Sequence, residues 1–351
     1  MADLASPAAL SRPGASPARV AVAQKPQVPD TPVAARYGDK IYSGVTLLAS
    51  LSIFVIILWL VWQLVGASMI SIHHSGWTFL TKPDWNEETD SYHALPFIFG
   101  TLYSSLIALI LSVPVSLGAA VFLSELAPRW IRTPATFLIE LLAAIPSVVY
   151  GLWGIFILIP WLKRWVMTPA ADHHMDHLPI FGALFAGIPT GYSMLAAGVI
   201  LAIMITPFIT AVTRDILRAI PRAQREGSYA LGATQWETIG RVVMPYAKSG
   251  IIGAVILGLG RALGETMAVT MVIGNGTPDL TKHPSGIDPS LINPANTMAS
   301  VLANKFNEAI PGLNISALVE IGLVLFCVTI GVNIIARLLV FYTAKDVQGR
   351  K

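Results

Sequence analysis

An arginine and a glutamate lie four residues apart inside a long apolar stretch. Arg261 and Glu265 are the only charged residues of segment 249–274. A guanidinium inside a bilayer costs from about 2.5 to over 10 kcal/mol, so it normally faces a protein interior or a water-filled path. Residues at i and i+4 share one face of a helix, so Glu265 can pair with Arg261 when no other anion is present. Arg261 is therefore a candidate functional residue, and a buried structural ion pair is the alternative interpretation.

The composition identifies the kind of protein that holds this pair. Of the 351 residues, 54% are hydrophobic and only 12% are charged, with a mean hydropathy of +0.65. Such values exclude an ordinary soluble protein and indicate a polytopic membrane protein. The formal net charge of +3 is small and gives no reason to expect nucleic acid as a partner. The single cysteine, Cys327, excludes an internal disulfide.

Six apolar segments are long enough to cross a bilayer as helices. They are residues 41–67, 95–124, 135–162, 192–212, 249–274 and 315–342. The second contains Pro114 and the third Pro146, so both helices are expected to be kinked. The sequence thus predicts an all-α membrane protein with six transmembrane helices.

The rest of the chain divides around these segments. Residues 1–40 are rich in proline and alanine and are predicted to be a disordered cytoplasmic tail. Residues 41–94 hold the first helix and an extracytoplasmic loop, residues 95–343 a core of five helices, and residues 344–351 a second cytoplasmic tail. With the N-terminus inside, 17 of the 23 Lys and Arg residues lie on the cytoplasmic side, so the positive-inside rule predicts that both termini are cytoplasmic.

The long cytoplasmic connection of the core, residues 214–248, contains a helix–turn–helix pattern. In the run from Arg225 to Pro245, residues 226–231 can form one amphipathic helix and residues 236–243 the next. Gly232 can end the first helix with a positive-φ turn. An amphipathic helix lying on the lipid headgroups is the alternative.

This run resembles the EAA loop of ABC-importer permeases, in which a short helix, a glycine turn and a second helix dock on the ATPase subunit. Glu226 is followed by a glycine at +6 and a proline at +19. Gly227 and Ser228 depart from the usual two alanines. The resemblance implies that the residues coupling this chain to the ATPase are Arg225, Glu226, Gly232, Ala233, Thr234 and Trp236.

Three further runs narrow the resemblance to permeases of phosphate ABC importers of the PstC type. They are Gly260-Arg-Ala-Leu-Gly-Glu-Thr-Met-Ala-Val269, Ile139-Glu-Leu-Leu-Ala-Ala-Ile-Pro-Ser-Val-Val-Tyr-Gly-Leu-Trp-Gly154 and Asn296-Thr-Met-Ala-Ser-Val-Leu-Ala-Asn304. The resemblance covers roughly residues 94–343 and implies the type I ABC importer permease fold. It also implies a multi-pass protein of the bacterial cytoplasmic (inner) membrane.

The family assembles as a complex. The resemblance implies a homologous second permease of the PstA type, two ATPase subunits of the PstB type and an extracytoplasmic phosphate-binding protein of the PstS type, all at the lipid bilayer. The chain contains no Gly-x-x-x-x-Gly-Lys-Ser/Thr loop, so we expect it to bind no cofactor and not to be an enzyme. ATP and magnesium are expected in the partner ATPase subunits.

The substrate path is expected at Arg261, which would contact phosphate transiently and return to Glu265 when the anion leaves. Glu140, near the cytoplasmic end of the third segment, is a further candidate. It can pair with an arginine of the partner or of the loop, assist Arg261, or stay partly hydrated at the interface.

Other interpretations stay open at this stage. The stretch 172–177 holds three histidines and two aspartates, but no fixed element orients them, so we expect no metal site. The same machine could carry molybdate or sulfate, or the chain could be the PstA-type sister subunit. An intramembrane enzyme would need paired catalytic groups, which the six segments lack, and a receptor or passive channel would not need the loop after Arg225.

Overall fold

The computed structural model describes residues 33–172, 182–277, 280–281 and 283–348. It divides into two compact units, Met1–Leu58 and Trp59–Lys351. The described part of the first unit is the beginning of one helix, α1 (Val33–Ser75).

This helix begins within the segment predicted to be disordered up to residue 40. Residues 33–40 are helical where the prediction has a disordered tail, and no proline follows Pro32 within that stretch. Residues 1–32 of the predicted tail lie outside the described residues.

Within the described residues, five helices are long and apolar enough to cross a membrane, and a bent pair raises the number to six. The predicted count of six is reached when the bent pair is taken as one span. The five are Lys40–Ser75, Leu95–Leu126, Met194–Ala219, Gln235–Leu263 and Leu313–Phe341. The last belongs to α15 (Leu313–Gln348), which continues through most of the predicted C-terminal tail.

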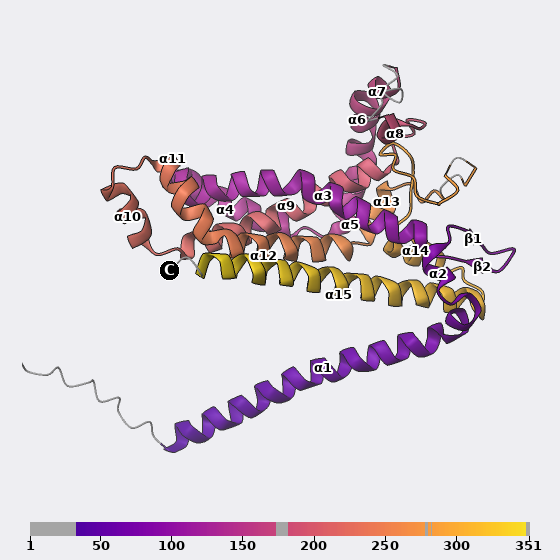
Figure 1. Cartoon of the computed structure of the whole chain (residues 1–351), viewed down its shortest axis with the longest axis horizontal. Coiled ribbons are helices and arrows are strands. Elements are labelled where there is room, and N and C mark those ends of the chain that lie inside the picture. The colour runs from indigo at the N-terminus through magenta and orange to yellow at the C-terminus, as the bar shows by residue number, and fades with distance from the viewer. Residues whose placement is uncertain (1–32, 173–181, 278–279, 282, 349–351) are drawn as a thin grey trace, which may run out of the picture. The chain divides into compact units, whose positions relative to one another are not determined.

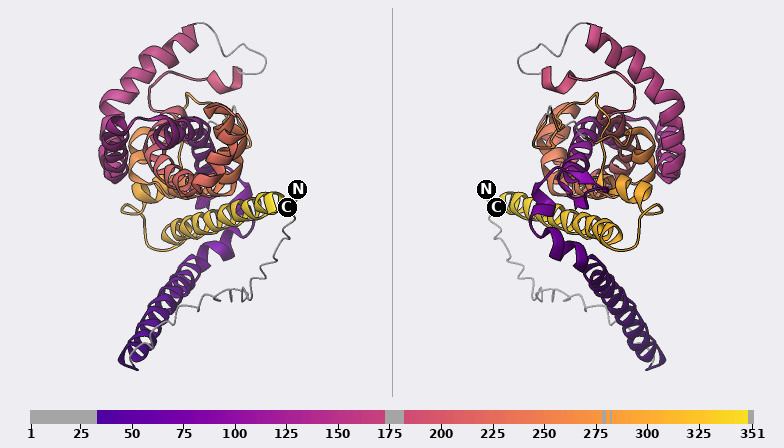
Figure 2. Two further views of the ribbon diagram at one scale, coloured as in Figure 1. Left: turned by 90° about the vertical axis from the view of Figure 1, so that its left-hand side faces the viewer. Right: turned by 90° about the vertical axis from the view of Figure 1, so that its right-hand side faces the viewer.

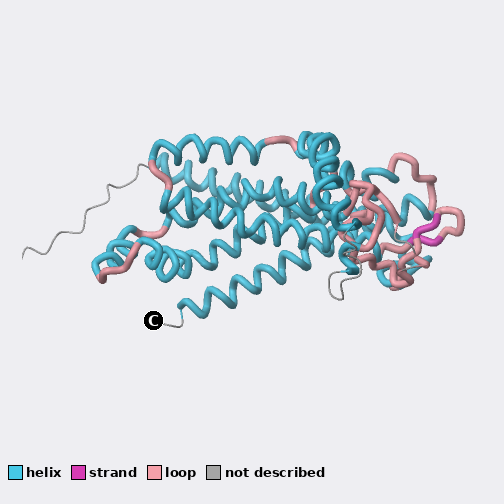
Figure 3. The backbone as a smooth tube through the Cα atoms, turned by 90° about the horizontal axis from the view of Figure 1, so that it is seen from above, coloured by secondary structure: helices cyan, strands magenta, loops and turns pink. Residues whose placement is uncertain are grey.

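The second unit is built around α3 (Leu95–Val121), α9 (Met194–Ala219) and α12 (Met244–Leu263). These helices run side by side, with most loops gathered at one end (Figure 1, Figure 3). Seen end-on, the helices of the bundle are arranged around a common centre (Figure 2). Small residues bring α3 and α9 close together, as is usual between membrane helices. Gly198 packs directly against Ile107, and Ser116 donates to the Thr206 carbonyl at 3.2 Å.

The bent pair consists of α4 (Arg129–Ala144) and the helical stretch Ser147–Asp172, which meet at an angle of 92°. The second stretch begins with α5 (Ser147–Trp153). The bend falls at Ile145, whose backbone is extended because the following Pro146 disfavours a helical conformation. Beyond α5 the chain continues through the π-helical turn η2 (Gly154–Leu158), α6 (Ile159–Leu162), the π-helical turn η3 (Lys163–Met167) and α7 (Thr168–Asp172). The α6–α7 part stands away from the bundle (Figure 1). The predicted kink is thus a nearly perpendicular bend.

The fifth predicted span is broken. Helix α12 ends at Leu263, and after Gly264, Glu265 and Thr266 a separate helix, α13 (Met267–Val272), begins. Gly258, Gly260 and Gly264 lower the helix propensity of this stretch by roughly 1 kcal/mol each relative to alanine. The prediction of one continuous helix over residues 249–274 was therefore wrong.

Shorter elements occupy the end of the bundle where most loops gather. They are α2 (Thr78–Thr81), the antiparallel strands β1 (Trp85–Asn86) and β2 (Ser91–Tyr92), α8 (Gly182–Phe185) and α14 (Met298–Lys305). In the hairpin Trp85 pairs with Tyr92 and Asn86 with Ser91. This hairpin and a single β-bridge between Gly274 and Ala295 are the β structure of the described residues. A buried cluster that includes Phe79, Phe97 and Leu318 packs α2, α3 and α15 together.

Candidate functional site

Arg261 lies in the last turn of α12, directly before the break in the fifth span. Its side chain is exposed on the surface of the chain, and its Cζ atom lies 5.8 Å from the ring centroid of Phe208 in α9. It is close enough to Tyr150 of α5 to interact with it electrostatically. The C-terminal end of a helix carries partial negative charge, which favours a cation at this position. The break thus supports an accessible positive charge within a membrane-spanning segment.

Glu265 lies on the other side of the break and serves the next helix. Its Oε1 accepts a hydrogen bond of 3.1 Å from the backbone N–H of Ala268, in the first turn of α13. A carboxylate is favoured there because the N-terminal end of a helix carries partial positive charge. Among the residues that the structure describes, Arg261 and Glu265 form no ion pair with each other. The predicted i, i+4 pair was wrong because it required a continuous helix through Gly264.

The two interrupted spans meet beside Arg261. Helix α5, which follows the bend at Pro146, packs against α13, which follows the break at Gly264. The contact is so close at Gly151 that an added Cβ would lie 3.2 Å from the Cα of Ala268. Interrupted membrane helices are a common way to build substrate sites in transporters, because they bring helix ends and polar groups into the membrane.

Glu140 pairs with an arginine of α9. Its Oε1 accepts from Nη2 of Arg214 at 3.1 Å, and Asp215 Oδ1 accepts from the same nitrogen at 2.9 Å. The Arg214 side chain is only 6% exposed, whereas those of Glu140 and Asp215 are 55% and 66% exposed. Arg214 had been predicted to lie in the loop, but α9 continues through it to Ala219. Of the alternatives considered for Glu140, the structure therefore shows the one in which it pairs with an arginine of this chain.

The predicted helix–turn–helix is present at the other end of the bundle. Helix α10 (Arg222–Ala230) leads through Gly232, which has a φ of +84°, into α11 (Gln235–Thr238). Thr234 caps α11, since its Oγ1 accepts from the Glu237 N–H at 3.3 Å while Glu237 Oε2 accepts from the Thr234 N–H at 2.9 Å. A π-helical turn, η5 (Ile239–Val243), then joins α11 to α12.

Apolar side chains are exposed around this turn. Leu231 is 91% exposed, Trp236 68% and Tyr229 45%. Glu226, Gly232 and Thr234 are exposed as well, and Ala233 is partly exposed. We call Tyr229, Leu231 and Trp236, with the exposed polar residues between them, the turn surface. Exposed apolar groups at one place commonly mark an interaction surface.

Arg225 differs from the other predicted coupling residues because its side chain is turned into the chain. It forms a two-point ion pair with Glu125, in which Nη2 and Nε lie 2.7 and 3.1 Å from the two carboxylate oxygens. Glu125 belongs to η1 (Phe122–Leu126), a π-helical turn that ends α3. Sequence reasoning missed Glu125 because it follows the second apolar segment and looks like an ordinary flanking residue. The sequence did contain a signal for this pair. Glu125 is an isolated acid at the end of an apolar segment, and residues 214–225 contain four arginines that could pair with it.

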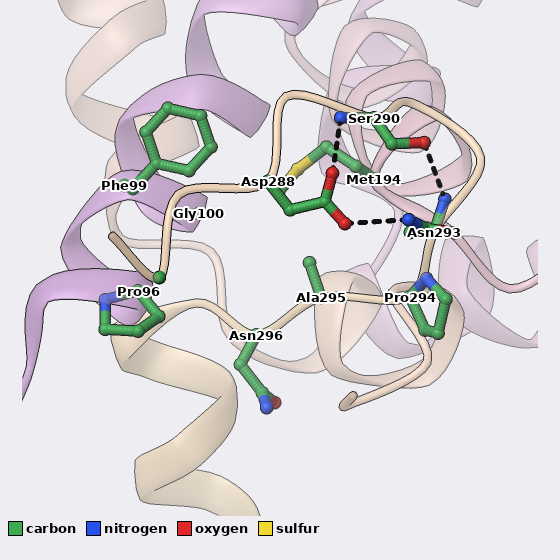
Figure 4. Close-up of a pocket in the computed structure, with 11 residues that line it drawn as sticks. Pro96, Phe99, Gly100, Met194, Asp288, Ser290, Asn293, Pro294, Ala295 and Asn296 are labelled. Carbon is green, nitrogen blue, oxygen red and sulfur yellow. Dashed lines mark hydrogen bonds between the residues drawn. The ribbon is translucent and has the colours of Figure 1, made fainter. Parts of the chain in front are cut away.

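A pocket lies at the opposite end of the bundle from the turn surface, between α3 and the segment 286–296 (Figure 4). Arg261 does not line this pocket. The carboxylate of Asp288 accepts hydrogen bonds from the Ser290 N–H at 2.9 Å and from Nδ2 of Asn293 at 2.7 Å (Figure 4). These bonds give the segment a defined conformation against α3. Most of the stretch 172–177, considered above for metal, lies outside the described residues.

Comparison with known proteins identifies the family. Residues 112–348 match the model of the family described as binding-protein-dependent transport system inner membrane component. The chain belongs to this family. As a member with several membrane-spanning helices, it is a multi-pass protein of the bacterial inner membrane and a component of an ABC transporter. This confirms the predicted family and localisation.

Individual relatives agree with the family. The chain is 45% identical over 313 residues to the phosphate transport system permease protein PstC of Pasteurella multocida, an alignment that covers 89% of this chain and 94% of the relative. It is 42% identical over 302 residues to the protein of the same name from Haemophilus influenzae, covering 86% and 93%. A chain of a bacterial alginate ABC transporter has a similar structure, with a TM-score of 0.55 at 15% identity over 87% of this chain and 95% of that one. This likeness supports the predicted type I ABC importer permease fold.

Proposed function

We propose that this chain is the permease subunit of an ATP-driven importer of inorganic phosphate. The observation that carries the proposal is the exposed guanidinium of Arg261 at the meeting point of two interrupted spans. The relatives named phosphate transport system permease protein point to the anion that this cation serves.

The chemistry of Arg261 suits such a substrate. Phosphate carries between about one and two negative charges near neutral pH. A guanidinium can donate two parallel hydrogen bonds to it, which an ammonium cannot. Glu265 lies in the break between α12 and α13, four residues after Arg261. Its negative charge limits how tightly an anion is held. Weak binding is needed because the anion must leave again.

Glu140 acts on the path indirectly in this proposal. It pairs with Arg214 and thereby fixes α4, the first half of the bent span, against α9. The bend then holds α5 and Tyr150 beside Arg261. Glu140 therefore supports the path through Arg214 and does not contact the anion.

The turn surface is the docking site for an ATPase subunit in this proposal. A compact helix–turn–helix with exposed Leu231 and Trp236 suits insertion into a groove, and Glu226 adds a charge at its edge. The turn surface would then face the cytoplasm, in agreement with the predicted orientation. ATP and magnesium would be bound by the ATPase subunits, and this chain would bind neither.

The complete importer would contain further subunits. A second permease of the PstA type would provide the other half of the path, facing the exposed side of Arg261, and two ATPases of the PstB type would dock on the permeases. A phosphate-binding protein of the PstS type would deliver the anion at the end that carries α14 and the hairpin.

The test is ATPase activity of the complex reconstituted with these partners in lipid vesicles. Phosphate delivered by its binding protein should stimulate hydrolysis, and sulfate and molybdate at equal concentration should neither stimulate nor compete. Stimulation by sulfate or molybdate, with none by phosphate, would contradict the proposal.

A further inference from the structure

The side chain of Arg225 joins three elements at the end of the bundle nearest the turn surface. Besides the two bonds to Glu125, Nη1 donates to the Ile220 carbonyl and Nη2 to the Leu217 carbonyl, both at 2.8 Å. Both carbonyls lie at the C-terminal end of α9. Arg225 itself is in α10, so one guanidinium connects α10, α9 and the end of α3.

This arrangement follows from helix chemistry. The last carbonyls of a helix have no partner within it, and a cation is favoured near them. The carboxylate of Glu125 balances the charge that this cap introduces. The two side chains are only 17% and 10% exposed, so the pair is shielded from water and its geometry is well defined.

Glu125 is also attached to the other half of the turn. Its backbone carbonyl accepts a hydrogen bond of 3.1 Å from Nε2 of Gln235, the first residue of α11. Helices α10 and α11 are joined to each other by the hydroxyls of Ser228 and Thr238, 2.9 Å apart. Both halves of the turn are therefore bonded to the same residue of η1.

From Glu125 the connection continues along α3. This helix has 27 residues and is about 40 Å long at 1.5 Å per residue. Near its far end, the Thr101 hydroxyl accepts from the Met298 N–H at 2.9 Å and the Tyr103 hydroxyl donates to the Pro289 carbonyl at 3.0 Å. The bond to Pro289 holds the segment 286–296, which lines the pocket of Figure 4, and the bond from Met298 holds the start of α14 directly after it. Helix α3, which is continuous through Pro114, thus connects Glu125 to both of these contacts.

We propose that Glu125 is the positioning residue that couples the turn surface to α3, and through α3 to the pocket at the opposite end. The inference rests on the proposed docking of an ATPase on the turn surface. The π-helical turn η1 suits this role, because π-helical turns occur frequently at functional sites.

The experiment compares Glu125→Gln with the wild type in the reconstituted complex, with Glu88→Gln as a control for loss of an exposed acid. We expect the ATPase subunits to copurify in normal amounts and basal hydrolysis to persist. Phosphate uptake per ATP hydrolysed should fall at least tenfold, because Arg225 then loses its charged partner and, among the described residues, only the bond from Gln235 to the backbone carbonyl of residue 125 joins the turn to η1. The control should keep the wild-type ratio.

A double variant tests whether the two side chains act as one unit. If they do, Glu125→Gln/Arg225→Gln should lower uptake per ATP no further than Glu125→Gln alone. A further multiplicative loss would overturn the inference. If Glu125→Gln does not reach the membrane in normal amounts, Arg225→Lys is measured in its place, since it keeps the charge and loses the two-point geometry.

Other outcomes separate this inference from the proposed function. If the wild-type complex is stimulated by phosphate but Glu125→Gln keeps its uptake per ATP, the inference fails and the proposed function stands. Loss of the ATPase subunits from a normally inserted Glu125→Gln chain would also overturn it, since the pair would then only shape the docking surface. If phosphate does not stimulate the wild type at all, it is the proposed function that fails.

Discussion

The hydroxyl of Tyr150 donates a hydrogen bond of 2.8 Å to the backbone carbonyl of Leu142. The bond crosses the bend between α4 and α5 and reaches a carbonyl that also accepts from the Ile145 N–H at 3.3 Å. Tyr150 also lies beside Arg261, so the side chain that stabilises the bend is next to the proposed anion site.

Replacing this tyrosine isolates the contribution of the bond. Tyr150→Phe should lower the free energy of unfolding by about 1 kcal/mol, because the Leu142 carbonyl loses its side-chain donor. Thermal unfolding of the purified chain measures the effect. Tyr246→Phe is the matched control, since Tyr246 is 52% exposed. Equal melting temperatures for the two variants would show that the bond does not stabilise the bend.

The two acids beside Arg214 should act synergistically. Glu140→Gln and Asp215→Asn should each cost under about 1 kcal/mol, because the remaining acid still balances the arginine and both acids are more than half exposed. The double variant leaves a buried guanidinium without a counter-charge and should cost about 3–5 kcal/mol. Simple additivity in unfolding measurements would argue against this account.

Replacing two different glycines with alanine should change the stability of the chain in opposite directions. At Gly151 a Cβ would collide with Met271 and lie 3.2 Å from Ala268, so Gly151→Ala should separate α5 from α13 and destabilise the chain by about 1–3 kcal/mol. At Gly227 in α10 a Cβ meets nothing within 4 Å, so Gly227→Ala should stabilise that helix by up to about 1 kcal/mol. Unfolding of both variants under one set of conditions provides the comparison, and a stabilised Gly151→Ala would be inconsistent with the close packing.

The hairpin should loosen in acid. A hydrogen bond from Lys305, at 2.6 Å, holds the pKa of Glu87 below its ordinary value. The lowered pKa means that the contact stabilises the folded hairpin above the ordinary pKa of the acid and is lost as pH falls through the folded value. Because both side chains are more than a third exposed, the contribution should be under about 1 kcal/mol.

Amide hydrogen exchange of residues 85–92 measures this contact. Exchange should accelerate on acidification relative to Glu87→Gln measured at the same pH, in which no carboxylate titrates. Glu88→Gln should keep the wild-type pH dependence. The same pH dependence in Glu87→Gln as in the wild type would rule out this contact as the cause.

Local signals in the sequence predicted the local structure well. Gly232 takes the positive φ that a turn between two short helices requires, and Thr234 and Glu237 form a capping box within four residues. The apolar runs likewise predicted the spans, because bilayer thickness fixes their length. Pro146 marked the bend, although its 92° angle depends on how α4 and α5 pack against other helices.

Contacts between distant residues could not be predicted in the same way. Glu125 and Arg225 are 100 positions apart, and their pairing depends on how α3, α9 and α10 pack. The break after Leu263 was missed because the segment is apolar enough overall to be taken as one span, although the glycines at 258, 260 and 264 hint at it. That break also decides whether Arg261 and Glu265 share a face, so the proposed site depended on information that hydropathy does not contain.

The central claim is that Arg261 contacts the transported anion, and phosphate uptake by Arg261→Lys in vesicles containing the complete complex tests it most directly. The lysine keeps the charge and loses the paired donors, so uptake should fall at least about tenfold while assembly is unchanged. Arg129→Lys, an exposed arginine of α4, should transport normally. Wild-type uptake by Arg261→Lys would contradict the account.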